Sequence, residues 1–183
     1  MKKLIMAGIT IFGLTLSGLI IPGKLSAQKE SHEGSMAACK EAKSAFLKAD
    51  PSMENLFRHS YGYAIFPNVG KGAAGIGGAA GRGTVYEKGI PVGTSQMIQV
   101  TVGAQAGGEA YREVIFFENK ESLQRFMHNK VEFSAETSAI AAKLGGSANV
   151  NYREGVVVFT QEKGGLMLDV SLGGQKFKYK PLK

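Results

Sequence analysis

A run of small residues at positions 70–83 constrains the fold of this chain more than any other feature, because eleven of its fourteen residues are Gly or Ala. Its start matches the G-x-G-x-x-G pattern of dinucleotide-binding loops through Gly70, Gly72 and Gly75. Such a loop must open a helix, whose N-terminus binds the pyrophosphate. Four more glycines follow, and each would cost a helix up to about 1 kcal/mol relative to Ala. We therefore predict extended chain and reject a dinucleotide site.

Residues two apart share a face in extended chain. One face of this run would carry nothing larger than a methyl group, since its members are Ala73, Gly75, Gly77, Ala79, Gly81 and Gly83. Glycine in a strand marks a bulge, a bend, or the close approach of a neighbouring element or ligand. We predict close packing, with ligand approach as the alternative, at Gly70, Gly72, Gly75, Gly77, Gly81 and Gly83.

The first 27 residues have the layout of a secretory signal peptide. Lys2 and Lys3 precede an apolar stretch at 4–21, and Leu25-Ser26-Ala27 is a small-residue cleavage site. An uncleaved anchor is the alternative, since the stretch approaches the ~20 residues of a membrane span; its interior glycines favour cleavage. We expect an exported protein, periplasmic or extracellular and peripheral to a membrane.

Cleavage would leave 156 residues, enough for one domain with a sizeable core. We expect a flexible lead-in at 28–36 and the domain at 37–183. The net charge of +7 falls to +4, because Lys2, Lys3 and Lys24 lie in the leader. This is not the charge of a dedicated nucleic-acid-binding protein, but it suits a weak preference for anionic lipid head groups.

Cys39 is the single cysteine, which excludes an internal disulfide and a thiolate metal cage. Met36-Ala37-Ala38-Cys39 resembles the tetrapeptide at which bacterial lipoproteins are lipidated, but the polar residues 29–33 separate it from the apolar stretch. We interpret Cys39 as a small apolar residue on a helix, with intermolecular pairing as the alternative.

Three segments are predicted to be helical. The first starts at Ser35 as N-cap and ends near Asp50, the second spans 51–57 with Pro51 in its first turn, and the third follows Asn119 as cap. Residues 131–143 are ambiguous between helix and strand.

Alternation of apolar and polar residues predicts several strands. They are a short strand at 64–67 stopped by Pro67, one or two strands in the small-residue run, a stretch at 84–86 before a Glu-Lys-Gly turn, strands at 97–106 and 111–117, a hairpin of 152–161 with 166–172, and a final strand at 175–180. The chain is thus predicted to be a single α+β domain, with a mostly antiparallel, strongly curved or barrel-like sheet and two or three helices.

Four motifs occur in the order and at the separations typical of the SYLF domain family. They are residues 61–67, the Gly70-Lys71-Gly72 step with its continuation, residues 103–108 and residues 163–174. The chain resembles this family over roughly 38–179. The resemblance implies a lipid-binding module without catalytic residues; eukaryotic members bind phosphoinositides, and some bind actin. For an exported bacterial protein we do not expect actin, and the expected ligand widens to anionic phospholipid.

Candidate catalytic groups are sparse. His32, His59 and His128 lie in separate segments without a second ligand at metal-binding spacing, so we expect ordinary surface histidines. Asp169 interrupts an apolar strand and is expected on its solvated face. No nucleophile elbow or acid–base pair emerges. The sequence predicts no enzyme, no cofactor and no metal site.

Basic residues are the better candidates for ligand contact. Lys176, Lys178 and Lys180 alternate with two aromatic residues, so one face of the final strand would present three charges. Each lysine near an anionic surface is worth about 1 kcal/mol. Protection of an exposed strand edge is the alternative.

Lys71 and Arg82 bracket the small-residue run. Together with N–H groups exposed by glycine they would suit an anion, and solvated loop charges are the alternative. We expect anionic phospholipid or a membrane surface as the partner, and no nucleic acid. The alternative function is an envelope assembly protein that forms a homo-oligomer or binds an envelope protein.

Overall fold

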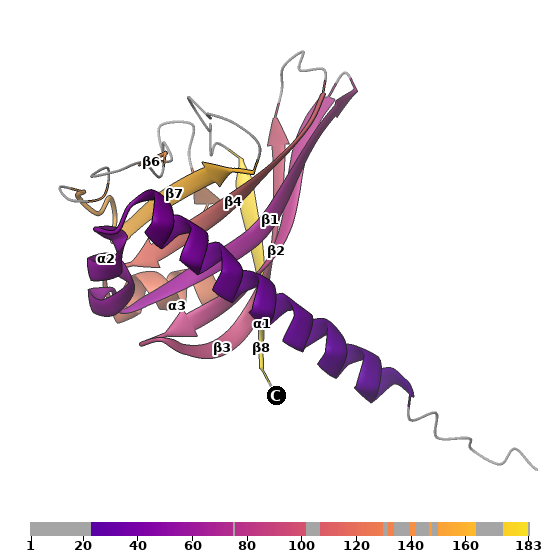
Figure 1. Cartoon of the computed structure of the whole chain (residues 1–183), viewed down its shortest axis with the longest axis horizontal. Helices are drawn as coiled ribbons and strands as arrows, with labels where there is room; N and C mark the ends of the chain where they lie inside the picture. The colour runs from indigo at the N-terminus through magenta and orange to yellow at the C-terminus, as the bar shows by residue number, and fades with distance from the viewer. Residues whose placement is uncertain are drawn as a thin grey trace, which may run out of the picture.

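The computed structural model describes residues 23–74, 76–101, 107–129, 132–133, 140–141, 147, 150–163 and 174–182. The elements in chain order are α1 (Gly23–Ala49), α2 (Met53–His59), β1 (Gly62–Ala74), β2 (Ile76–Glu87), β3 (Ile90–Thr101), β4 (Gly107–Phe117), α3 (Lys120–Met127), β5 (Glu132–Phe133), β6 (Ile140–Ala141), β7 (Val156–Glu162) and β8 (Gln175–Pro181) (Figure 1). None of these helices, within the described residues, combines the length and apolar character of a membrane span.

The strands form one sheet in the order β5-β8-β3-β2-β1-β4-β7-β6. The six longer strands pair antiparallel throughout, and the two-residue β6 runs parallel to β7. Within the described residues β5 and β6 form the two ends, so the sheet is curved and open. The predicted α+β class with a mostly antiparallel, strongly curved sheet is confirmed.

The curvature brings distant strands into contact across the inner face. Nε2 of Gln175 on β8 lies 3.1 Å from Oε2 of Glu113 on β4, although three strands separate them in the sheet. On the same face, the rings of Phe66 and Phe177 lie 5.8 Å apart, and Phe126 of α3 packs 5.0 Å from Phe177. The inner face therefore encloses a core that α3 covers.

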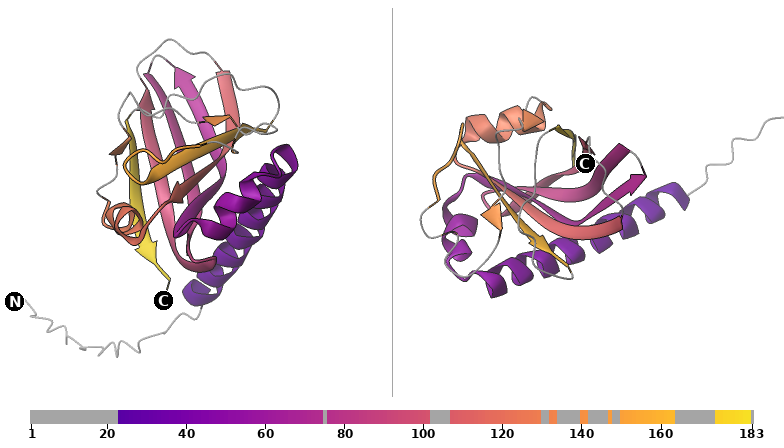
Figure 2. Two further views of the ribbon diagram at one scale, coloured as in Figure 1. Left: turned by 90° about the vertical axis from the view of Figure 1, so that its left-hand side faces the viewer. Right: turned by 90° about the horizontal axis from the view of Figure 1, so that it is seen from above.

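The outer face carries a second core, covered by α1 and α2, so the sheet lies between helices (Figure 2). Alternate residues of the central strands point to the two cores: Ile115 and Phe117 of β4 belong to the inner one, Val114 and Phe116 to the outer one. Burial on both faces explains why β4 ends in a continuous apolar run at 114–117.

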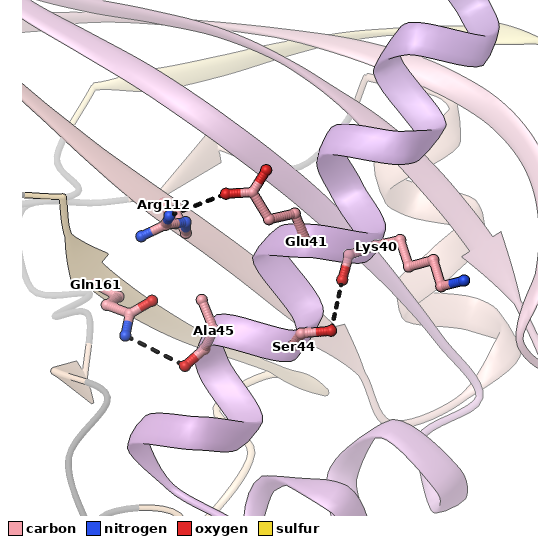
Figure 3. Close-up of polar contacts among 6 residues, drawn as sticks. All are labelled: Lys40, Glu41, Ser44, Ala45, Arg112 and Gln161. Atoms are coloured by element: carbon pink, nitrogen blue, oxygen red, sulfur yellow. Dashed lines mark hydrogen bonds and ion pairs between the residues drawn. The ribbon is translucent and has the colours of Figure 1, made fainter.

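Helix α1 packs on the outer face through small and aromatic side chains, including Cys39, Ala42 and Phe46, all buried. Two polar contacts hold its flank: Gln161 Nε2 donates to the Ala45 carbonyl at 3.3 Å, and Arg112 lies 3.8 Å from Glu41 (Figure 3). The prediction that Cys39 is a buried apolar residue on a helix is confirmed, and burial raises the pKa of its thiol.

The corner between α1 and α2 is built around a buried carboxylate. Asp50 accepts hydrogen bonds from the Ser52 hydroxyl at 2.5 Å, the Ser52 amide at 3.1 Å and the Ser147 amide at 2.8 Å. Burial alone would raise the pKa of Asp50, but these hydrogen bonds outweigh it and lower the pKa to about 2. Asp50 thus ties the corner to a segment 97 residues further along the chain.

Two turns follow the sequence predictions closely. Lys88 and Gly89 have φ of 50° and 80°, so the predicted turn between β2 and β3 is a two-residue hairpin loop that needs left-handed backbone. Asn119 caps α3 as predicted, since its side chain accepts from the Ser122 amide at 2.9 Å in a capping box.

Two sequence predictions are wrong. The first helix begins at Gly23 and not at Ser35, so residues 28–36 are helical; helix formers such as Leu25, Ala27 and Gln28 favour this extension. The strand at 64–67 does not stop at Pro67, because β1 runs on to Ala74. A register shift against both neighbouring strands lies between residues 65 and 69, and this bulge accommodates a residue without an N–H group.

The ambiguous segment 131–143 contains β5 and β6 in its described residues. The strand predicted at 166–172 and Asp169 lie outside the described residues, so its hairpin with 152–161 remains a prediction.

The small-residue run forms a hairpin of β1 and β2, with Gly72 paired to Gly78 and Ala73 paired to Gly77; Gly75 lies outside the described residues. Close packing is tightest at Gly83. A Cβ there would collide with the Ile65 carbonyl and lie 2.8 Å from the Phe66 ring, whereas a Cβ at Gly70 would meet nothing within 4 Å.

We predict that Gly83→Ala destabilises the fold by about 1–3 kcal/mol, because the methyl group has to displace backbone of β1. Gly70→Ala, from the same small-residue run, is the matched control and should change stability by no more than about 0.5 kcal/mol. Urea denaturation of both variants measures the difference. Equal stability of the two would contradict close packing at Gly83.

Stability should also depend on Asp50 at acid pH. Because the pKa of Asp50 falls from 3.8 to about 2 on folding, its contribution is present above pH 4 and is lost as the pH falls toward 2. The shift corresponds to roughly 2 kcal/mol. Between pH 5 and pH 2, the free energy of unfolding should therefore fall by roughly 2 kcal/mol less in Asp50→Asn than in the wild type. Glu121→Gln, at an exposed position of α3, is the control and should follow the wild type. Parallel pH profiles for Asp50→Asn and the wild type would rule this out.

Candidate functional site

The structure brings Arg82 together with two of the predicted lysines on the outer face of the sheet. Arg82 of β2 pairs with Gln96 of β3, which pairs with Lys178 of β8. In the next row Ala80 pairs with Ile98, and Ile98 pairs with Lys176. Directly paired residues of antiparallel strands project to the same side. We call the surface of Arg82, Gln96, Ile98, Lys176, Lys178 and Lys180 the basic face.

Every member of the basic face is exposed. Helix α1 covers the sheet only as far as Thr84, which is fully buried and accepts a hydrogen bond from the Cys39 thiol at 3.5 Å. Thr84 lies two residues after Arg82 on the same side of β2. It pairs with Thr94 of β3, which pairs with Lys180 of β8. The basic face therefore begins where α1 ceases to cover β2.

The spacing of the charges follows from sheet geometry. Arg82 and Lys178 stand two strands apart, about 10 Å between backbones, and successive lysines of β8 are about 7 Å apart. Glu132 of β5 pairs with Lys176 and places an acidic residue at one end of the face. The positive charge is accordingly concentrated at Arg82, Lys178 and Lys180.

An aliphatic side chain lies among these charges. Ile98 is 59% exposed, and only it and Ile90 are large exposed hydrophobic residues in the described part of the chain. Ile98 projects between its cross-strand neighbours, the small Ala80 and the cationic Lys176. A surface of this kind can contact apolar material and anions together.

The predicted alternation in the final strand is confirmed, because Lys176, Lys178 and Lys180 are exposed while Phe177 is buried in the inner core. Edge protection, the alternative role of these lysines, applies to part of the strand. Within the described residues, β5 pairs with β8 at residues 175 and 176, and the Tyr179 amide donates to the Asn129 side chain at 2.8 Å.

Other predicted site residues lie elsewhere. Lys71 is in β1 opposite Ala79 and Glu109, outside the rows of the basic face. Gly72 and Gly77 pair within the β1–β2 hairpin, and Gly70 is exposed in β1. At Gly81 a Cβ would lie 2.9 Å from Val69, so a neighbouring strand approaches there closely.

A polar cluster inside the inner core was not predicted. Gln99 of β3, Glu113 of β4 and Gln175 of β8 are all buried, and Gln175 Nε2 lies 3.4 Å from Gln99 Oε1 as well as 3.1 Å from Glu113. Burial raises the pKa of nearby Tyr111, and the negative charge of Glu113 raises it further. The strand alternation could have indicated this cluster, because it places Glu113 on the inward-facing side of β4 between Tyr111 and Ile115.

The histidines do not assemble a site in the described residues. His59 and His128 each contact a carbonyl one turn earlier in their own helix, Asn55 at 2.9 Å and Gln124 at 2.7 Å. No three His, Cys, Asp or Glu side chains of the described part of the chain gather as metal ligands would.

Comparison with known proteins agrees with the motif analysis. A family model described as Ysc84, Las17-binding protein actin regulator, matches residues 98–180. Beta cell expansion factor A of Aeromonas veronii is 29% identical over 137 residues, which cover 69% of this chain and 49% of the relative. This chain thus spans about half the length of that relative.

The family match includes two of the four motifs, residues 103–108 and 163–174, together with β8 and most of the basic face. The predicted resemblance is therefore confirmed: residues 98–180 match the SYLF (Ysc84) family model, and the relative from Aeromonas veronii is similar over 137 residues.

Proposed function

We propose that this protein is a non-enzymatic, peripheral lipid-binding domain that docks on anionic phospholipid through the basic face. The observation that carries the proposal is the placement of exposed Ile98 among Arg82, Lys176 and Lys178. The match to the SYLF family model supports a binding role rather than a catalytic one.

The chemistry of the face favours a lipid surface over other anions. Each lysine or arginine near an anionic membrane contributes about 1 kcal/mol, and this attraction falls off within a Debye length. An exposed aliphatic side chain adds its own gain when it enters the head-group region. A soluble polyanion would satisfy the charges of Arg82 and Lys178 but would leave Ile98 in water.

The pairing of neighbouring strands suits the same partner. Three adjacent strands, β2, β3 and β8, present side chains in register, so several head groups can be contacted at once. Several weak contacts then act together, which is how a mildly basic protein reaches useful affinity for a surface.

We further propose that the protein reaches its membrane after export through a signal peptide at residues 1–27. The proposal rests on the Lys2-Lys3 start, the apolar stretch and the Leu25-Ser26-Ala27 site. Anionic phospholipid on the far side of the inner membrane, or on another membrane, is then the accessible ligand.

In co-sedimentation with vesicles containing anionic phospholipid, we expect Arg82→Glu/Lys178→Glu to lower the partition coefficient at least about tenfold, because two attractive charges become repulsive. Vesicles of zwitterionic lipid should bind neither protein well. Binding of the wild type should weaken steeply as salt is raised.

Lys120→Glu/Lys163→Glu is the matched control, since it changes the net charge equally at exposed positions away from the basic face. Ile98→Ser tests the apolar contribution and should reduce the binding that persists at high salt. An equal loss in both charge-reversed variants would assign binding to net charge alone. Lipid-independent oligomers in light scattering, with no pelleting by vesicles, would favour the assembly function.

Cleavage of the signal peptide predicts the mass of the exported protein. The protein recovered from the secreted or periplasmic fraction should begin at Gln28 and lack the leader, as measured by intact mass spectrometry. A full-length mass in that fraction would contradict cleavage. An added diacylglyceryl mass on a chain starting at Cys39 would instead establish the lipoprotein alternative.

A further inference from the structure

A pocket of about 540 Å³ lies beside α2 and the entry to β7, and it shares no lining residue with the basic face. Its lining comes from the last turn of α2, from Glu118 after β4, and from Ser147 and residues 150–152. The volume falls in the range of small-molecule sites. Neither the family match nor the basic face accounts for it.

The floor of the pocket is apolar. Leu56, Val150 and Tyr152 are partly buried and pack against the outer core, so their exposed surfaces face the pocket. An aromatic ring and two aliphatic side chains can receive a short apolar body.

The walls are polar and rich in acceptors. Asn55 and Asn151 contribute amide groups, and Ser60 and Ser147 contribute hydroxyls. The pocket lies at the C-terminal end of α2, where the Asn55 and Leu56 carbonyls already have His59 and Ser60 as partners. A helix C-terminus carries partial negative charge and favours cations.

With histidine counted as neutral, Glu118 carries the only formal charge among the described lining residues, which also include His59. Glu118 is exposed, makes no ion pair among the described residues, and lines the same pocket as Tyr152. Behind the wall, Asp50 holds Ser147 with its carboxylate. No lysine or arginine occurs among the described lining residues.

We infer that this pocket binds a primary ammonium group on a short apolar body, with Glu118 as its counter-ion and Tyr152 beside it. The carboxylate, the amide oxygens and the hydroxyls accept the three N–H bonds of the ammonium group. The body lies on Leu56, Val150 and Tyr152. The pocket is independent of the basic face, so this inference stands or falls separately from the proposed function.

Saturation-transfer NMR and calorimetry with three probes of one shape test the inference: phenethylamine, the neutral 2-phenylethanol and the anionic 3-phenylpropionate. We expect the amine to bind the wild-type protein at least about tenfold more tightly than the alcohol, and the acid not to bind. Glu118→Gln should remove the preference for the amine, while Glu121→Gln, an exposed residue outside the pocket, should retain it.

Glu118 is exposed, so thermal unfolding should show that Glu118→Gln is folded. Equal affinity of the wild type for amine and alcohol would overturn the inference without recourse to a variant. Amine binding that survives Glu118→Gln would also overturn it.

Discussion

The strong curvature of the sheet is the constraint on which the other features depend. Curvature allows Gln175 of β8 to reach Glu113 of β4 across three intervening strands, and it closes the inner core between Phe66, Phe177 and Phe126. A flat sheet would hold β4 and β8 about 19 Å apart and expose these rings. The close approach of β1 to Gly83 of β2 is part of the same packing, because no side chain separates the two backbones there.

Curvature also determines which surfaces remain open. Helices α1 and α2 cover the outer face over β1, β4, β7 and part of β2, whereas β3 and β8 turn away from them (Figure 2). The basic face is the uncovered remainder, and the pocket lies where α2 meets the entry to β7. One surface offers cations around Ile98, and the other offers carboxylate and carbonyl oxygens. Opposite charge chemistry on two separate surfaces suits two different ligands.

Much of the local structure could be predicted because it depends on neighbouring residues. The Asn119 cap, the Lys88-Gly89 turn and the alternation of Lys178 with Phe177 follow from short-range rules that this chain obeys. Pro67 misled the prediction, since a bulge in the middle of β1 tolerates a missing N–H group. The start of α1 was missed because the stretch before Ser35 lacks strong apolar periodicity although its residues favour a helix.

The sequence by itself determined the fold class, the alternation that exposes the lysines of β8, and the resemblance to the SYLF family, because these follow from local periodicity and from ordered motifs. Only the tertiary structure decided which charges act together. Arg82 is 96 positions from Lys178, and strand order makes them near neighbours while leaving Lys71 outside their rows. The same holds for Glu118 and Tyr152, and for Glu113 and Gln175. Pairing between strands far apart in sequence is set by the packing of the whole core, which no local pattern encodes.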